Sequence, residues 1–136
     1  MTPELLYLSQ HDVKSLNLTM KEVIEALDMG FRLRGQGKTE MPAKIGVHSV
    51  TDAFIHAMPA HVQGVATGLK WVSGYPENPK RGLPYITGLL VMNDPTTGVP
   101  IAVMDCAWIT ATRTGASAAI SAAAPNAKPS RRPASP

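Results

Sequence analysis

The sequence is poor in the residue types around which many functional sites are built. Of its 136 residues, one is cysteine, 17% are charged and 5% are aromatic. The single cysteine, Cys106, cannot form an internal disulfide, which fits a reducing compartment. No stretch holds the roughly 20 apolar residues of a spanning helix, and Met1–Glu4 lack the basic start of a secretory signal. We therefore expect a cytoplasmic protein with no membrane partner.

Sequence motifs for nucleotides and metals are also missing. The chain has no P-loop and no complete Gly-x-Gly-x-x-Gly pattern. Gly35-Gln-Gly37 follows a predicted helix instead of a strand and lacks the third glycine, so it indicates a helix end. The four histidines, at positions 11, 48, 56 and 61, do not have the spacing of zinc ligands. We predict no metal site.

The net charge of +3 originates at the end of the chain. The sequence has thirteen Lys and Arg against ten Asp and Glu. Three of the basic residues, Lys128, Arg131 and Arg132, lie among the last twelve, which leaves ten of each sign in residues 1–124. A body with balanced charge lacks the basic surface that nucleic acid requires. We predict no nucleic-acid partner.

Size and composition predict one folded domain followed by a short tail. The length is typical of a single domain, and 44% apolar residues are enough for a core. Beyond Ala124, residues 125–136 contain four prolines and no apolar residue larger than alanine. Such a segment cannot offset the entropy of ordering. We therefore predict a domain over 1–124 and a disordered tail over 125–136.

Hydrophobic spacing and turn residues predict an α/β fold of α+β-like character, with a mixed sheet and flanking helices. The firmest helix starts at Thr19, because Thr19 and Glu22 form a capping-box pattern. Asp94–Gly98 predicts a hairpin loop, since proline and glycine there suit a turn. We expect helices over 11–16, 19–35 and 107–123, and strands over 5–8, 44–48, 53–58, 67–73, 85–92 and 100–104, with a long loop over 74–82.

Three cations stand isolated in apolar or small-residue segments: Lys44, Lys70 and Arg113. A cation on a buried face is costly unless an anion meets it, and the few carboxylates nearby lie in predicted loops or caps. The three cations either converge on the carboxylate or phosphate of a ligand, or each reaches solvent separately. Cys106 is either a thiol with a lowered pKa at a helix start or, as we favour, a small buried residue.

Four segments carry a resemblance to a known family. They are Met41–Lys44, His56–Pro59, Gly68–Asn78 and Leu90–Ala116. Over roughly residues 5–122 the chain resembles the N-terminal part of the ornithine cyclodeaminase and mu-crystallin family. The resemblance implies a substrate-binding and dimerisation domain, which members pair with a Rossmann domain for NAD(P).

The resemblance also implies an activity. Cyclodeaminases are lyases that convert L-ornithine to L-proline and ammonia with catalytic NAD, and related members are NAD(P)-dependent imine or amino-acid oxidoreductases. The implied ligand is the carboxylate of a small amino or imino acid, and the implied assembly is a homodimer. The alternative is a non-catalytic small-molecule-binding or dimerisation module of mu-crystallin type.

Individual residues acquire roles from the same resemblance. Lys44 and Lys70 match family cations that hold the substrate, and Arg113 matches an arginine that faces substrate and cofactor. Tyr85 aligns with a position that contacts the cofactor. His56 occurs where cyclodeaminases can carry a glutamate beside the substrate amine, which argues against ornithine itself.

The likeness ends after Ala119, where the sequence changes character. The cofactor domain, with its glycines and its catalytic aspartate, is not found in these 136 residues. We therefore expect a truncated gene product that contains no catalytic residue and does not transfer hydride alone. We also expect exposed apolar faces on helix 19–35 or on the sheet, and hence self-association.

Overall fold

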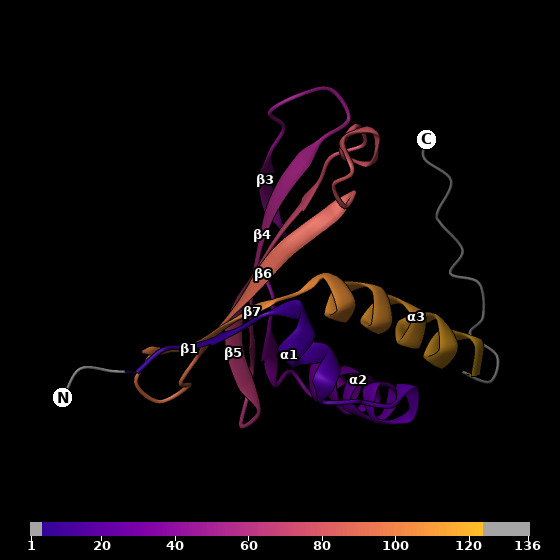
Figure 1. Cartoon of the computed structure of the whole chain (residues 1–136). Helices are drawn as coiled ribbons and strands as arrows, with labels where there is room; N and C mark the ends of the chain where they lie inside the picture. Colours follow the sequence, from indigo (N-terminus) through magenta and orange to yellow (C-terminus); the bar gives the residue numbers. More distant parts are fainter. Residues whose placement is uncertain (1–3, 124–136) are drawn as a thin grey trace, which may run out of the picture.

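The computed structural model describes residues 4–123, which form one mixed sheet with helices on one side of it (Figure 1). Within this range there are seven strands, three α-helices and one 3₁₀ turn. The structure therefore confirms the predicted fold class. The predicted tail over 125–136 lies outside the described residues.

The helices are α1 (Gln10–Ser15), α2 (Met20–Gly35) and α3 (Ala107–Ala123), and the 3₁₀ turn is η1 (Asn78–Arg81). The strands are β1 (Leu6–Leu8), β2 (Thr39–Glu40), β3 (Ile45–Val47), β4 (Phe54–Val62), β5 (Ala66–Gly74), β6 (Ile86–Asn93) and β7 (Pro100–Asp105).

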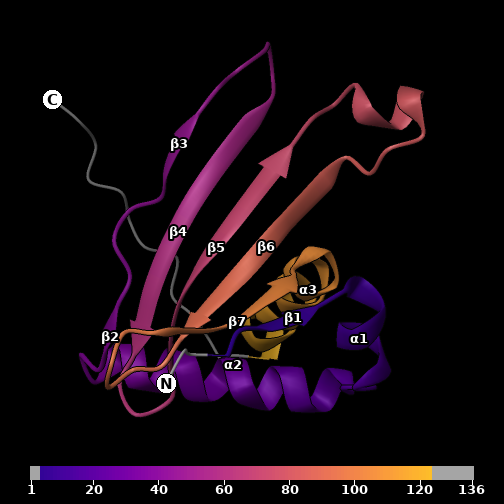
Figure 2. The same cartoon turned by 60° about the vertical axis from the view of Figure 1, so that its left-hand side comes forward.

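The sheet has the strand order β1-β7-β6-β5-β4-β2, and β3 also pairs with β4. β1 runs parallel to β7, whereas the other pairs are antiparallel. The long strands β4, β5 and β6 lie side by side, and α3 lies behind them (Figure 2). Met58, Lys70 and Leu90 are aligned across these three strands. Aligned residues have their side chains on the same face of a sheet. The Lys70 side chain therefore lies on the same face as the side chains of Met58 and Leu90.

Three local features differ from the sequence prediction, and the first is the strand β2, which was not predicted. β4 continues to Val62, beyond the predicted end at residue 58, and passes through Pro59. In the described chain, β2 pairs with β4 at His61 and β3 pairs with it at Ala57, so Pro59 lies between the two short partner strands. A proline is tolerated where no ladder hydrogen bond is required. The predicted loop over 74–82 also contains the turn η1, which the sequence analysis did not distinguish.

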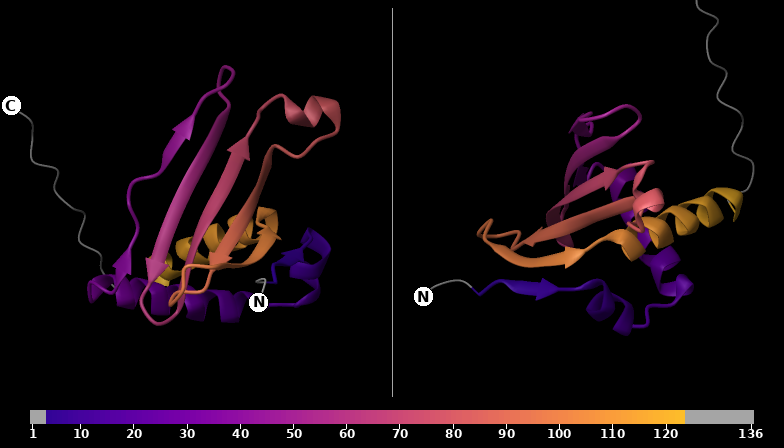
Figure 3. Two further views of the ribbon diagram at one scale, coloured as in Figure 1. Left: turned by 90° about the vertical axis from the view of Figure 1, so that its left-hand side faces the viewer. Right: turned by 45° about the horizontal axis from the view of Figure 1, so that its top comes forward.

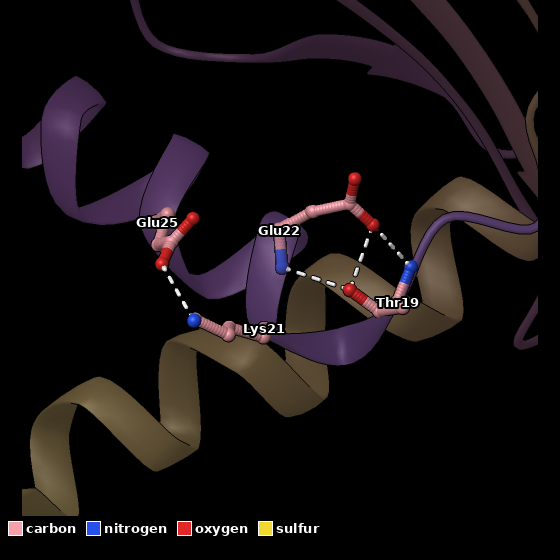
Figure 4. A network of polar contacts seen from close by, with 4 residues as sticks. All are labelled: Thr19, Lys21, Glu22 and Glu25. Carbon is pink, nitrogen blue, oxygen red and sulfur yellow. Dashed lines mark hydrogen bonds and ion pairs between the residues drawn. The ribbon is translucent and has the colours of Figure 1, made fainter.

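Helices α1 and α2 begin with capping boxes. The Thr19 hydroxyl accepts a hydrogen bond from the Glu22 N–H at 3.3 Å, and the Glu22 carboxylate accepts one from the Thr19 N–H at 2.8 Å (Figure 4). Ser9 and Asp12 make the same exchange at the start of α1. Reciprocal bonds of this kind satisfy N–H groups that a helix start leaves free, so the short sequence pattern is sufficient to fix both helix starts.

The two faces of the sheet have different surroundings. We call the face that carries the helices the helix face and the other the open face (Figure 3, left). On the helix face, α3 packs against α2, and Ala116 of α3 is fully buried, as expected for a helix of small residues. On the open face, Ile45, Ala57, Trp71 and Leu89 form an aligned row. Ile45 is 70% exposed and Trp71 45%, which confirms the expected exposed apolar surface.

Candidate functional site

The helix face brings Lys44 and Lys70 to the same level of the sheet. Lys70 on β5 is aligned with Met58 on β4, and Lys44 directly precedes Ile45, which is aligned with Ala57. Continuing that register places Lys44 opposite Met58. Two strand spacings, about 10 Å, therefore separate the two lysine backbones. Both side chains belong to the helix face.

Helix α3 brings Arg113 close to Lys70. Burial, and after it the positive charge of Arg113, lower the pKa of the Lys70 ammonium below its usual value. Lys70 is half-buried, whereas Lys44 and Arg113 are exposed. Two of the three cations selected from the sequence are thus neighbours in space, although 43 positions separate them along the chain.

None of these three cations has an ion-pair partner within residues 4–123. A half-buried ammonium beside a guanidinium, with no carboxylate to neutralise either, costs stability and attracts anions. The ion pairs found in this part of the chain involve other residues and lie within single helical segments: Lys21–Glu25 at 3.9 Å, Arg32–Asp28 at 2.7 Å and Lys80–Glu77 at 2.7 Å.

His56 is a further member of this face. Its ring stacks on Phe54, with centroids 4.3 Å apart, and meets His48 edge-on at 6.3 Å. Desolvation, followed by the positive charges of Lys44 and His48, lowers the pKa of His56. The imidazole is therefore uncharged at neutral pH, and it adds a polar but neutral group beside the lysines.

Cys106 is the most deeply buried of the functional candidates. Its side chain is 0% exposed, and burial raises the pKa of the thiol. The Thr110 hydroxyl donates a hydrogen bond to Sγ at 3.7 Å. The alternative of a thiol with a lowered pKa is wrong, because loss of hydration outweighs the effect of the nearby Lys70 charge.

Tyr85 lies apart from the cations. It directly precedes β6, five residues before Leu90, which is aligned with Lys70. Five residues of strand span about 17 Å. The Tyr85 side chain is exposed, and its carbonyl accepts a hydrogen bond from the Tyr75 N–H at 3.0 Å. The structure does not bring Tyr85 to Lys70, and its cofactor contact stays a prediction.

Gly88 is a residue that the sequence analysis did not select. It lies on β6, aligned with Val72. A Cβ atom at this position would clash with the Trp71 carbonyl oxygen and lie 2.9 Å from Cys106 Sγ. A lone glycine inside an apolar strand is a signal of close approach, and this signal could have identified Gly88.

A cavity of about 310 Å³ lies between α2 and α3, and Arg113 is at its margin. Glu22 also lines this cavity, but its carboxylate accepts hydrogen bonds from Thr19. Within residues 4–123 Arg113 forms no ion pair with Glu22, so its guanidinium remains available to a ligand.

Two further kinds of site are not found in the described part of the chain. Among residues 4–123, no cluster of three or more His, Cys, Asp or Glu side chains could hold a metal ion. In the same range, no helix is long and apolar enough to cross a membrane.

Comparison of the sequence with protein families gives one match over most of its length. The profile of the ornithine cyclodeaminase/mu-crystallin family matches residues 4–131. The chain is 46% identical over 115 residues to the nodulation efficiency protein NfeD of Rhizobium meliloti. It is 44% identical over 119 residues to the alanine dehydrogenase of Archaeoglobus fulgidus. These alignments cover 84% and 88% of this chain but 36% of each relative.

Solved structures show the same fold. An archaeal alanine dehydrogenase dimer with bound NAD superposes with a TM-score of 0.81 at 43% identity, over 87% of this chain and 36% of that one. The Δ¹-pyrroline-2-carboxylate reductase of Thermococcus litoralis, in complex with NADH and L-proline, gives a TM-score of 0.81 at 39% identity, with 85% and 36% coverage. The chain thus spans little more than a third of the length of these relatives.

Proposed function

Because this chain belongs to the ornithine cyclodeaminase/mu-crystallin family, we propose that it forms the carboxylate-binding side of an enzyme acting on small amino or imino acids. The observation that supports this proposal is the half-buried Lys70, which lies beside Arg113 and has no carboxylate partner within residues 4–123. A ligand carboxylate supplies the missing negative charge.

The three cations suit a carboxylate in complementary ways. The planar guanidinium of Arg113 donates two parallel hydrogen bonds to the two carboxylate oxygens. The Lys70 ammonium adds a charge that is strengthened by its partial burial. The register continues to Lys44 on the other side of Met58, and we propose that Lys44 completes the set.

The charge of the site favours ligands with a single amino or imino group. Lys44, Lys70 and Arg113 are cationic, and the His56 imidazole is neutral at physiological pH. A second ammonium, as in ornithine, would meet repulsion from these groups instead of a carboxylate. We therefore propose that monoamino or cyclic imino acids bind better than diamino acids.

NAD is the cofactor bound by the solved relatives. Within residues 4–123, no glycine-rich turn joins a strand to a helix, so this part of the chain does not fit a dinucleotide in the Rossmann manner. We propose that the conversion of L-ornithine to L-proline and ammonia, or a related oxidoreduction, requires a dinucleotide-binding domain. The 136-residue chain alone binds the carboxylate without turnover.

The test is a binding titration of the 136-residue chain with L-proline and with pyrrole-2-carboxylate, followed by NMR. We expect saturable binding, with no binding of prolinamide, which lacks the carboxylate. Replacing Lys70 or Arg113 by Met removes a charge-assisted hydrogen bond, so the affinity falls at least about tenfold.

The matched control is Lys80→Met, because Lys80 is exposed and pairs with Glu77. Its affinity for both ligands stays at the wild-type level. Absence of binding by the wild type, or equal loss in the Lys80 variant, would overturn the proposal.

A second candidate is a non-catalytic module that dimerises. The exposed row of Ile45, Trp71 and Leu89 on the open face favours it, because an apolar surface of this kind is typical of an interface. A homodimer is also consistent with the first function. The carboxylate titration separates the two candidates, since a pure dimerisation module shows no saturable binding.

A further inference from the structure

Cys106, which links β7 to α3, makes a close contact with Gly88 on β6. The Cys106 N–H donates a hydrogen bond to the Gly88 carbonyl at 3.1 Å. The Cys106 side chain is completely buried. A Cβ atom at position 88 would clash with the β5 backbone at Trp71 and would lie 2.9 Å from Cys106 Sγ. The absence of a side chain at Gly88 therefore leaves room for both the β5 backbone and the Cys106 sulfur.

The first turns of α3 continue this contact toward the ligand site. Residues 106, 110 and 113 follow helical spacing and lie on one face of the helix. The Thr110 N–H donates to the Cys106 carbonyl at 2.8 Å, and its hydroxyl donates to Sγ. Arg113 follows one turn later, and its positive charge acts on the Lys70 ammonium. The first two turns of α3 thus connect the contact between Cys106 and Gly88 with Arg113.

Lys70 is connected to the same contact from the sheet side. It lies on the same face of β5 as Val72, which is aligned with Gly88. Its ammonium is close enough to Cys106 for each group to affect the charge of the other. The position of Arg113 relative to Lys70 therefore depends on how deeply Cys106 packs against Gly88.

We propose that Cys106, packed against Gly88, is a positioning residue that sets the separation of Lys70 and Arg113 and thereby the affinity of the site for a carboxylate. This inference rests on the proposed function. Neither residue touches the ligand. They act by fixing α3 against β6, and a displacement of about 1 Å in such a site is enough to weaken binding strongly.

The experiment compares four variants of the 136-residue chain by NMR. Cys106→Ala removes the sulfur, Gly88→Ala crowds both Cys106 Sγ and the β5 backbone at Trp71, and Cys106→Ser keeps the size and the Thr110 bond. Ala116→Gly is the control, because Ala116 is equally buried but lies about 15 Å further along the helix than Cys106. Two quantities are measured in each: the dissociation constant of pyrrole-2-carboxylate and the pKa of Lys70, from the ¹³Cε shift.

We expect Cys106→Ala and Gly88→Ala to weaken binding about tenfold. In both, the pKa of Lys70 rises toward its ordinary value: in Gly88→Ala because α3 and Arg113 are displaced outward, and in Cys106→Ala because the looser packing lets water reach the ammonium. Cys106→Ser retains affinity within about twofold, since the serine hydroxyl has similar reach. Ala116→Gly lowers the unfolding midpoint but leaves affinity and the pKa of Lys70 unchanged.

Two results would overturn the inference. One is wild-type affinity and an unchanged pKa of Lys70 in Cys106→Ala. The other is an equal loss of affinity in Ala116→Gly, which would show that any destabilisation of α3 has this effect. If the wild type binds no carboxylate, the proposed function fails. The role of Cys106 is then tested by the pKa of Lys70 alone, and an unchanged pKa in Cys106→Ala overturns it.

Discussion

Lys70 illustrates how a single side chain can cost stability in the free protein. Its ammonium is half-buried beside Arg113, and both circumstances disfavour its charged form. Its pKa in the folded chain therefore lies below the value in the unfolded chain. In the pH range between these two values the unfolded chain binds more protons, so stability rises with pH. Below this range the full cost is present.

Replacement of Lys70 by Met should stabilise the protein at neutral pH by up to about 1 kcal/mol, because Met keeps the length of the side chain without the charge. Urea unfolding at pH 7 and at about pH 10.5 measures the effect. The gain shrinks at the higher pH, where the lysine has lost much of its charge in both states. Lys80→Met, at an exposed lysine, gives no such gain. A Lys70 variant less stable than wild type at pH 7 would contradict this account.

The residue types in the sequence indicated which side chains belong to the candidate site, but not which of them lie close together. Lys44, Lys70 and Arg113 were identifiable because each is a lone cation in an apolar or small-residue segment. The proximity of Lys70 to Arg113 depends on how α3 returns across the sheet, which no local pattern encodes. That none of the three has an ion-pair partner within residues 4–123 is also a property of the fold. Gly88 was missed because its importance arises from Cys106, which lies eighteen positions away.

At the scale of elements, the start of α2 depends on Thr19. Its hydroxyl and Glu22 exchange hydrogen bonds, and the Thr19 side chain, followed by its backbone N–H, lowers the pKa of Glu22. A carboxyl whose pKa is lowered by folding stabilises the protein above its ordinary pKa, and this contribution is lost as pH falls through the lowered value.

Replacement of Thr19 by Ala should therefore destabilise the protein by about 1 kcal/mol at neutral pH. The difference from wild type becomes smaller in acid, once Glu22 is protonated. Thermal unfolding at pH 7 and at about pH 3 measures both effects. Thr51→Ala, in an exposed turn, serves as the control and leaves the midpoint unchanged. An equal loss at both pH values would show that the carboxylate of Glu22 has no part in the effect.

The elements were predictable where their signals are local. Both capping boxes and the Asp94–Gly98 turn are encoded in a few adjacent residues, and the structure has helices and a hairpin at these places. The structure also gives Gly98 the positive φ that such a turn needs. β2 and the continuation of β4 through Pro59 arise from pairing between distant segments. No local pattern could have indicated them.

At the scale of the whole molecule, we expect the open face to determine association. Trp71 lies in the middle of an apolar row that is aligned from β3 to β6. Large aromatic side chains at the centre of an interface supply much of its binding free energy. The archaeal alanine dehydrogenase that shares this fold was solved as a dimer. We expect this chain to form a homodimer through the open face.

Replacement of Trp71 by Glu should weaken the dimer at least about 30-fold, since it removes a central aromatic and introduces a charge. Analytical ultracentrifugation over a range of concentrations measures the dissociation constant. Leu83→Glu, at an exposed apolar residue beside η1, is the control and leaves the dimer intact. A monomeric wild type, or a Trp71 variant that dimerises normally, would count against this interface.

The borders of the sheet limit what kind of assembly can grow. One border is the three-residue strand β1, and the other consists of the two- and three-residue strands β2 and β3. An incoming strand finds only a short, interrupted template at either side, which disfavours the continuous backbone pairing of fibres. Growth into filaments through the sheet borders is thereby disfavoured, and a two-fold contact through the open face ends once that face is covered. We therefore expect the protein to form finite particles even though the described residues expose so much apolar surface.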